Sequence, residues 1–271
     1  MRFASRTRQV LSREPVFFAT SVVILIAFML PTLVAMQFDE RLLNGINVWI
    51  KPLKFHFAIA VYLLTLSYFA NWLSDEFLKN RAYRMFAIIV AITTLLELIW
   101  INGAALHGVA SHYNRDSVFM QVVYGFMGIF AVTLISSSLI YGIQFFKQKT
   151  QLNESVQFAI AVGLTLTFFL TVIVAGYMSS QPNHWVGGNL SDAESIAVVG
   201  WATDGGDLRV AHFFATHALH IIPIFGLIVG SFLSVKASKW FTTAVATGFA
   251  AFVLWTLNQA ISGISFLSFI N

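Results

Sequence analysis

The feature that most constrains this chain is the recurrence of seven long apolar stretches separated by polar connections. A helix needs about 20 consecutive apolar residues to cross the hydrocarbon core of a bilayer. The stretches occupy residues 15–36, 51–73, 84–106, 118–146, 156–178, 210–234 and 241–269. The sequence therefore predicts an all-α integral membrane protein with seven transmembrane helices, in a single membrane domain of residues 1–271.

The composition supports this class and excludes several kinds of site. Hydrophobic residues make up 58% of the chain and charged residues only 10%, whereas a soluble domain has roughly a quarter charged residues. There is no cysteine, which excludes disulfides, thiolate metal sites and iron–sulfur clusters. The predicted partner is the lipid bilayer, and the net charge of +4 requires no nucleic acid.

The first stretch follows a basic segment, residues 1–14, and so imitates a signal peptide. Its apolar run is longer than the 7–15 residues typical of a signal peptide, which predicts an uncleaved first helix. The positive-inside rule then sets the orientation, because cytoplasmic loops carry an excess of Lys and Arg. With the amino end inside, eleven of the sixteen basic residues are cytoplasmic: Arg2, Arg6, Arg8, Arg13, Lys79, Arg81, Arg84, Lys147, Lys149, Lys236 and Lys239. We expect the amino end in the cytoplasm and the carboxyl end outside.

Residues 206–220 hold an unusual density of polar groups at the start of the sixth helix. Asp207 and Arg209 precede His212, His217 and His220. At about 100° per residue, His217 and His220 are neighbours on one helix face, and His212 stands to the side and nearer the mouth. Pro223 removes a backbone donor and predicts a kink just below the pair.

Other polar side chains enter the same half of the membrane under this topology. His56 lies early in the second helix, Glu97 and Asn102 late in the third, and Asn258 late in the seventh. Glu97 precedes His107 by ten residues, which places it about 15 Å deeper on a continuous helix. An unpaired carboxylate there is costly, so we expect Glu97 to be protonated, paired or facing water.

Imidazole and carboxylate groups are the ligands of zinc, iron and copper sites, and paired imidazoles bind haem iron axially. The predicted metal ligands are His217, His220, His56 and Glu97, with haem b or a transition metal as cofactor. A shallower ring comprises His107, His112 and His212. The residues predicted to hold a substrate or gate the mouth are Arg209, Asp207, Lys54, Asn102 and Asn258.

Each of these interpretations has an alternative. On the alternative interpretation, the shallow histidines form hydrogen bonds to water or backbone and nothing more, and Lys54 and Arg209 merely extend to the lipid headgroups. The long connection 179–209 is either a lid over an outward-facing cavity or a permissive loop. The leading hypothesis is an outward-facing histidine-rich pocket. The alternatives are a proton-coupled transporter or small-molecule sensor without cofactor, and a membrane scaffold or assembly factor. The sequence predicts no particular reaction.

A weak internal repeat is also present. The segment 54–58 resembles 210–215, and the separations from His56 to His212 and from Asn102 to Asn258 are both 156 residues. This pattern suits a duplicated four-helix unit that has lost its eighth helix.

Two segments, Ser111-His112-Tyr113-Asn114 and 206–219, resemble a family of bacterial multi-pass membrane proteins of uncharacterised function. The resemblance runs from the second helix to the sixth and implies an integral protein of the bacterial cytoplasmic (inner) membrane. Haem A synthase and the seven-helix zinc hydrolases are similar in carrying intramembrane histidines. However, the fourth and last helices here have none, so the chemistry of those enzymes is not carried over.

Overall fold

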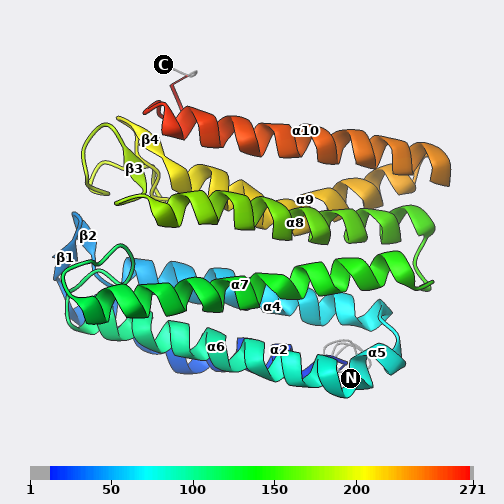
Figure 1. The fold of residues 1–271 in the computed structure, drawn as a ribbon, viewed down its shortest axis with the longest axis horizontal. Helices are drawn as coiled ribbons and strands as arrows, with labels where there is room; N and C mark the ends of the chain where they lie inside the picture. Colours follow the sequence, from blue (N-terminus) through cyan, green and yellow to red (C-terminus); the bar gives the residue numbers. More distant parts are fainter. Residues whose placement is uncertain (1–12, 269–271) are drawn as a thin grey trace. The chain divides into compact units, whose positions relative to one another are not determined.

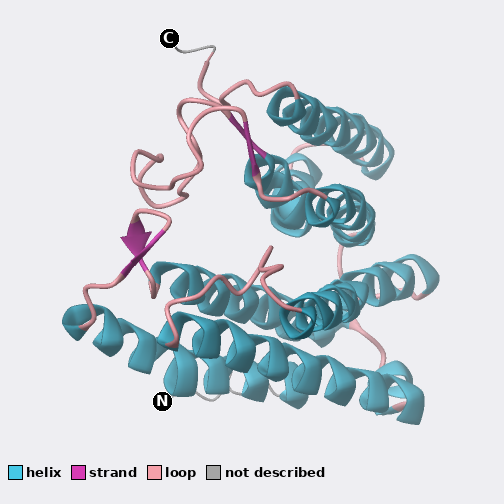
Figure 2. Ribbon diagram, turned by 60° about the vertical axis from the view of Figure 1, so that its left-hand side comes forward, coloured by secondary structure: helices cyan, strands magenta, loops and turns pink. Residues whose placement is uncertain are grey.

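The computed structural model describes residues 13–268, and helices make up most of that length (Figures 1 and 2). The basic residues Arg2, Arg6 and Arg8 of the orientation argument lie outside the described residues. Within the described part, seven helices are long and apolar enough to cross a membrane, which confirms the predicted class. They are Pro15–Phe38, Ile50–Trp72, Arg81–Leu106, Val118–Lys147, Glu154–Ser180, Leu208–Gly230 and Val235–Ile261.

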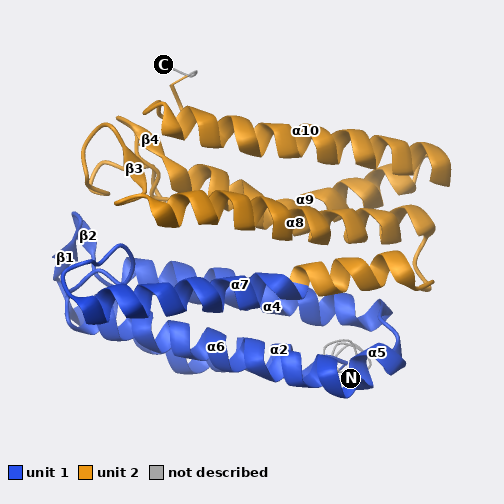
Figure 3. Ribbon diagram, in the orientation of Figure 1, with its two compact units in different colours: residues 1–137 blue, residues 138–271 orange. Residues whose placement is uncertain are grey.

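The chain divides into two compact units, Met1–Ser137 and Ser138–Asn271, which we call unit 1 and unit 2 (Figure 3). The boundary falls inside helix α7 (Val118–Lys147). The predicted grouping of all seven helices into a single domain stays a prediction. In unit 1 the connections 39–49 and 107–117, and in unit 2 the connection 181–207 and residues 262–268, each follow a span of odd number. We call this end of each unit its long-loop side.

Unit 1 begins with a composite helix made of α2 (Pro15–Val23), the π-helical turn η1 (Ile24–Met29) and α3 (Leu30–Phe38). The π turn has a local cause in Pro31, which has no N–H to donate to the preceding turn. The N–H of Leu30 instead reaches back five residues to the carbonyl of Leu25. Such a turn inserts one extra residue into the helix and is frequent at functional sites.

The rest of unit 1 is a hairpin followed by further helices. Strands β1 (Leu42–Leu43) and β2 (Ile46–Asn47) pair antiparallel around Asn44 and Gly45, both of which have positive φ. This Asn-Gly pair is the usual solution for a two-residue type I′ turn. Next come α4 (Ile50–Phe69), the 3₁₀ turn η2 (Ala70–Trp72), α5 (Asp75–Lys79) and α6 (Arg81–Leu106).

Unit 2 contains α8 (Glu154–Ser180), α9 (Leu208–Gly230) and α10 (Val235–Ile261). Small residues let these helices approach closely, as is usual inside membranes. A Cβ added at Gly226 on α9 would lie 2.1 Å from the Cβ of Ala159 on α8. Helices α8 and α9 are joined by a long connection that strands β3 (Trp185–Val186) and β4 (Gly206–Asp207) close as an antiparallel pair.

The last helix differs most from its predicted limits of 241–269, because local capping decides its ends. It begins at Val235, because the Ser234 side chain accepts a hydrogen bond from the N–H of Ala237 and so caps the first turn. It ends at Ile261, because Gly263 has a φ of +72° and reverses the chain. The N–H groups of Gly263 and Ile264 return to the carbonyls of Ala260 and Gln259, which is the Schellman arrangement.

The two units share an order of elements that bears on the predicted repeat. In each, a short antiparallel strand pair closes the connection before the helix that carries His56 or His212. In each, the following span ends at a glycine with positive φ, Gly108 or Gly263. The duplication itself stays a prediction.

Candidate functional site

The interior of unit 1 contains a chain of three polar side chains, one from each of its first three spans. The Thr32 hydroxyl on α3 donates to Asn102 Oδ1 on α6 over 3.1 Å. Asn102 Nδ2 lies 2.8 Å from His56 Nε2 on α4. Because His56 is fully buried and Thr32 is 2% exposed, this chain lies in the core. We call Thr32, His56 and Asn102 the unit 1 triad.

The orientation of the Asn102 amide follows from a further bond. Asn102 Nδ2 also donates to the carbonyl of Leu98 over 2.8 Å. Only the nitrogen can face a carbonyl oxygen, so the atom next to His56 is a donor. His56 Nε2 must therefore present its lone pair, and the ring proton sits on Nδ1. That Nδ1 is buried and has no hydrogen-bond partner among the described residues.

Glu97, five residues before Asn102 on α6, is only 4% exposed. No hydrogen bond or ion pair of its carboxyl is found within residues 13–268. Thr94, one turn earlier and on the same helix face, has a buried hydroxyl that also lacks a partner there. A charged carboxylate in such surroundings carries a large desolvation cost, so the group is expected to be neutral at rest.

The remaining predicted residues of unit 1 lie towards the long-loop side. His107 caps the end of α6 and is exposed. His112 Nδ1 lies 3.0 Å from the Ser111 hydroxyl, and its ring packs against Phe55. Lys54 is half-buried on α4. These side chains belong to the periphery of the unit, unlike His56 and Glu97.

In unit 2, His217 and His220 are neighbours on α9, as the helical spacing predicts, with ring centroids 5.6 Å apart. His217 Nδ1 lies 2.7 Å from the carbonyl of Phe213, and its ring stacks on the Phe213 ring. The carbonyl fixes the proton on Nδ1 and leaves Nε2 with its lone pair. His212 is half-buried, and its Nδ1 has no hydrogen-bond partner among the described residues.

Asp207 and Arg209 organise the long connection of unit 2. Asp207 caps α9 by accepting from the Arg209 N–H over 3.0 Å. The Arg209 guanidinium forms ion pairs with Asp207 and Asp192, at 2.6 and 2.7 Å. It also donates to the carbonyl of Gly200, and Asp207 accepts from the N–H of Ala202. We call Asp192, Asp207 and Arg209 the loop latch.

Two further side chains surround the latch. His184 Nδ1 lies 3.6 Å from Asp207 Oδ1, and Trp185 packs beneath the Arg209 guanidinium at 5.9 Å from its ring centroid. Burial alone would raise the pKa of Asp207, but nearby His184 and the hydrogen bonds from Arg209 outweigh it and hold that pKa below its ordinary value. Burial lowers the pKa of His184, so its imidazole is neutral near pH 7.

The sequence did not single out Asp192 as the second acid of the latch, because seventeen residues separate it from Arg209. It also missed Glu14, which is 3% exposed beside the first span and accepts a short hydrogen bond from the Tyr83 hydroxyl. Burial raises the pKa of Glu14 above its ordinary value, although the Tyr83 bond acts in the opposite direction. An acid placed immediately before Pro15 was the available signal.

The predicted metal ligands divide between the units, with His56 and Glu97 in unit 1 and His217 and His220 in unit 2. Within the described residues, no group of three or more His, Asp or Glu side chains could hold a metal ion. Asn258, predicted to line the mouth, is exposed on α10. The binding of haem or a metal stays a prediction.

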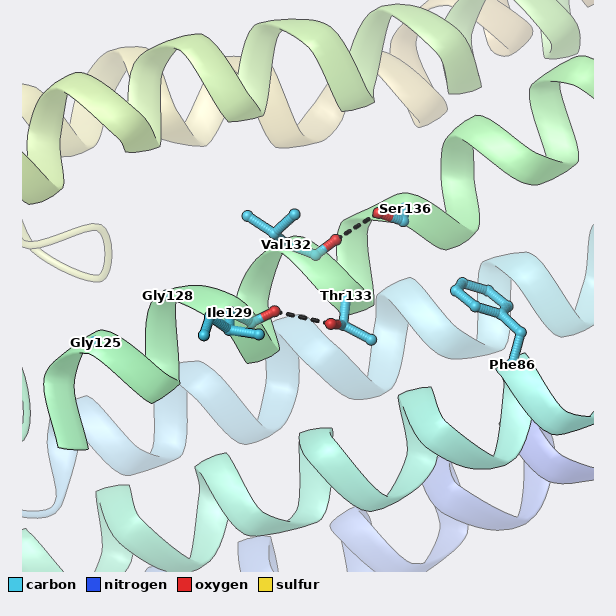
Figure 4. A pocket seen from close by; sticks show the side chains of 7 residues that line it. All are labelled: Phe86, Gly125, Gly128, Ile129, Val132, Thr133 and Ser136. Atoms are coloured by element: carbon cyan, nitrogen blue, oxygen red, sulfur yellow. Dashed lines mark hydrogen bonds between the residues drawn. The ribbon is translucent and has the colours of Figure 1, made fainter. Parts of the chain in front are cut away.

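A groove of about 590 Å³ lies in unit 1, lined by Phe86 on α6 and by Gly125, Gly128, Ile129, Val132, Thr133 and Ser136 on α7 (Figure 4). Its two hydroxyls are already used, since Thr133 donates to the Ile129 carbonyl and Ser136 to that of Val132. The groove is therefore apolar in character. None of the predicted site residues lines it.

Comparison of the chain with protein-family models, curated proteins and solved structures finds no match in any of the three. The functional argument consequently depends on the chemistry of the unit 1 interior and of the polar groups on α9.

Proposed function

We propose that this chain is a proton-coupled transporter in which Glu97 and His56 take up and release protons inside unit 1. The observation that carries the proposal is Glu97, a buried carboxyl in a membrane-spanning helix with no partner among the described residues. Acids and histidines held inside membrane spans mark proton pathways, because they are too costly to keep for structure alone.

The energetic argument concerns what the Glu97 carboxyl can do in such a place. An ionised side chain at the centre of a membrane helix costs about 3 kcal/mol or more. The neutral acid avoids that cost, and the anion forms only when a proton has somewhere to go. His56, buried on the neighbouring α4 with an Nδ1–H that has no partner among the described residues, supplies a second group that can take up and release a proton.

The orientation that we propose places the long-loop side outside and the amino end in the cytoplasm. It is supported by the count of basic residues, because this orientation puts eleven of the sixteen Lys and Arg residues on the cytoplasmic side, and that bias sets topology. The bacterial cytoplasmic membrane is the proposed location, on the resemblance to bacterial multi-pass proteins. The loop latch would then face the external medium.

The test is a pH step applied to proteoliposomes on a solid-supported membrane, which needs no knowledge of the solute. Protonation of a buried group moves charge within the membrane and produces a transient current. We expect Glu97→Gln, which keeps the shape and removes the titrating proton, to reduce the charge moved at least about tenfold.

The exposed Glu76 on α5 offers a matched control, since Glu76→Gln should leave the current unchanged. Wild-type protein without a pH-dependent current, or an undiminished current in Glu97→Gln, would refute the proposal.

A second function, binding of a transition-metal ion on α9, is favoured by the arrangement of His217. Its Nδ1 is turned to a backbone carbonyl, as in most metal-ligating histidines, so Nε2 is oriented for a metal. His220 stands one turn further along. Two imidazoles on the same helix favour a metal ion over haem, whose two axial ligands approach from opposite faces.

This second function predicts that purified protein binds Zn²⁺ or Ni²⁺ in calorimetric titration. His217→Gln should weaken the affinity at least about tenfold, because one of two protein ligands is lost. His107→Gln, at the exposed end of α6, serves as the control and should bind normally. Equal affinity in the His217 and His107 variants would contradict a site on α9.

A further inference from the structure

We infer that Asn102 is a positioning residue that decides which nitrogen of His56 can accept a proton and which can release one. This inference rests on the proposed function, in which His56 carries protons. It comes from the hydrogen bonds of the unit 1 triad rather than from the identity of any solute. It assigns a role to two residues, Asn102 and Thr32, that do not titrate themselves.

The first step is that both the nitrogen and the oxygen of the Asn102 amide are hydrogen-bonded. Its two N–H donors are used by the Leu98 carbonyl and by His56 Nε2, both at 2.8 Å. Its oxygen accepts from the Thr32 hydroxyl at 3.1 Å. An amide turned over by 180° would place its oxygen against the Leu98 carbonyl, which is repulsive. The bonds therefore select one amide orientation and, with it, the Nδ1–H tautomer of neutral His56.

The second step concerns proton uptake. Neutral His56 has a single lone pair, on Nε2, and Asn102 covers it. A proton arriving there would create an Nε2–H facing an amide N–H, so two donors would oppose each other. The charged ring is accommodated only when the amide turns and offers Oδ1 to Nε2–H, which gives up the bond to the Leu98 carbonyl. Thr32 can follow the change, because a hydroxyl both donates and accepts.

The third step concerns release. Once Nε2 carries the new proton, the ring becomes neutral again by losing the proton on Nδ1, which is buried and unpartnered among the described residues. One proton enters at Nε2, one leaves at Nδ1, and His56 is left as the Nε2–H tautomer bonded to Asn102 Oδ1. The starting Nδ1–H tautomer is recovered when Nδ1 takes up a proton, Nε2 releases one and the amide turns back. The orientation of the Asn102 amide thus decides at which nitrogen His56 holds its proton.

Few ionisable side chains near His56 could exchange a proton with it. The described part of the first span, residues 15–38, has no side chain of Asp, Glu, His, Lys, Arg or Tyr before its end, and Phe28 of the π turn packs against the imidazole at 5.8 Å between ring centroids. Within two turns of Asn102 on α6 the ionisable residues are Glu97 and His107, and within two turns of His56 on α4 they are Lys51, Lys54 and Tyr62. Tyr124 is the ionisable residue of α7 within unit 1. Glu97 alone among them is a buried acid.

The experiment is nitrogen NMR of protein labelled with ¹⁵N-histidine in bilayers, with the His56 signals assigned by their loss in His56→Gln. In wild-type protein at a pH where His56 is neutral, we expect the Nδ1–H tautomer to exceed the Nε2–H form at least about tenfold. Asn102→Asp presents only acceptor oxygens, so it should invert the ratio or leave the ring charged. The exposed Asn80 caps the start of the same helix by accepting hydrogen bonds, as an aspartate also can, so Asn80→Asp is the matched control and should leave the His56 spectrum unchanged.

Two outcomes would overturn the inference, namely an Nε2–H tautomer in the wild type or an unchanged ratio in Asn102→Asp. The conservative Asn102→Gln variant keeps the amide but displaces it by one methylene group. It should therefore retain the preference for the wild-type tautomer only in part. The pH-step current depends on Glu97, whereas the tautomer ratio is read directly at His56. Failure of the transport proposal and failure of this inference are therefore distinguishable.

Discussion

Replacement of Arg209 by methionine is expected to lower the free energy of unfolding by about 3 kcal/mol. The variant keeps an unbranched apolar stem but leaves Asp207 and Asp192, whose side chains are 1% and 8% exposed, without their cation. Removal of one partner of a buried ion pair costs about 3–5 kcal/mol, and the lower end applies because the Arg209 side chain is 25% exposed. Unfolding in mixed detergent and sodium dodecyl sulfate measures the difference.

In the same variant, the pH dependence of the free energy of unfolding should have the opposite sign to that of the wild type. In the wild type the pKa of Asp207 is depressed, so its contribution to stability is present above the ordinary carboxyl range and is lost only as pH falls through the depressed value. Without Arg209, burial dominates and raises the pKa of Asp207. Stability of Arg209→Met should then increase as pH falls from 7 towards 5, and the gap to the wild type should narrow.

Two controls separate this effect from loss of any surface charge. Arg81→Met, at the exposed start of α6, should change stability by less than about 0.5 kcal/mol. Adding Asp207→Asn and Asp192→Asn to Arg209→Met removes the buried charges and should recover part of the loss. An Arg209→Met protein as stable as the Arg81→Met protein at pH 7 would show that the loop latch contributes nothing.

The second large effect is expected for Gly206→Ala. A Cβ at Gly206 would lie 2.0 Å from the carbonyl oxygen of Ala260 and 2.8 Å from its carbonyl carbon. These are backbone atoms in the last turn of α10, so no side-chain rotation relieves the clash. The strand pair with Val186 or the end of α10 must move, at a cost of about 3 kcal/mol or more.

Gly248→Ala is the matched control, because it lies on α10 with open space around the added Cβ. It should be neutral or slightly stabilising, since alanine favours helix more than glycine does. Thermal unfolding and limited proteolysis of the 181–207 connection would compare the two variants. Equal melting temperatures would contradict the close packing of Gly206 on α10.

The sequence predicted the class and the seven spans well, because hydropathy is a property of each segment alone. It also predicted that His217 and His220 are neighbours, since that relation depends only on helical geometry. The ends of α10 were less predictable. They are set by the Ser234 cap and by positive φ at Gly263, which act against a hydropathy pattern that continues beyond them.

The polar contacts between helices could not be predicted in the same way. The bond between His56 and Asn102 joins residues 46 positions apart, and Thr32 lies 70 positions from Asn102. The sequence identified His56 and Asn102 as functional candidates because they are polar within apolar spans. It could not show that Asn102 covers Nε2 of His56, and Thr32 was indistinguishable from other helix threonines that bond their own backbone.

The π turn at Ile24–Met29 has a consequence for the rotational phase of the first span. One extra residue rotates everything after it by about 100° relative to a continuous α-helix. Thr32 follows the turn and Ser21 precedes it, and both face the interior of unit 1, with Ser21 near the Ala60 carbonyl of α4. A chain one residue shorter in this turn would keep its hydropathy and its span, yet Thr32 would point away from Asn102. We therefore expect single-residue insertions and deletions here to alter the contacts of the unit 1 triad without altering the topology, which makes the length of the turn, and not only its composition, part of what specifies the site.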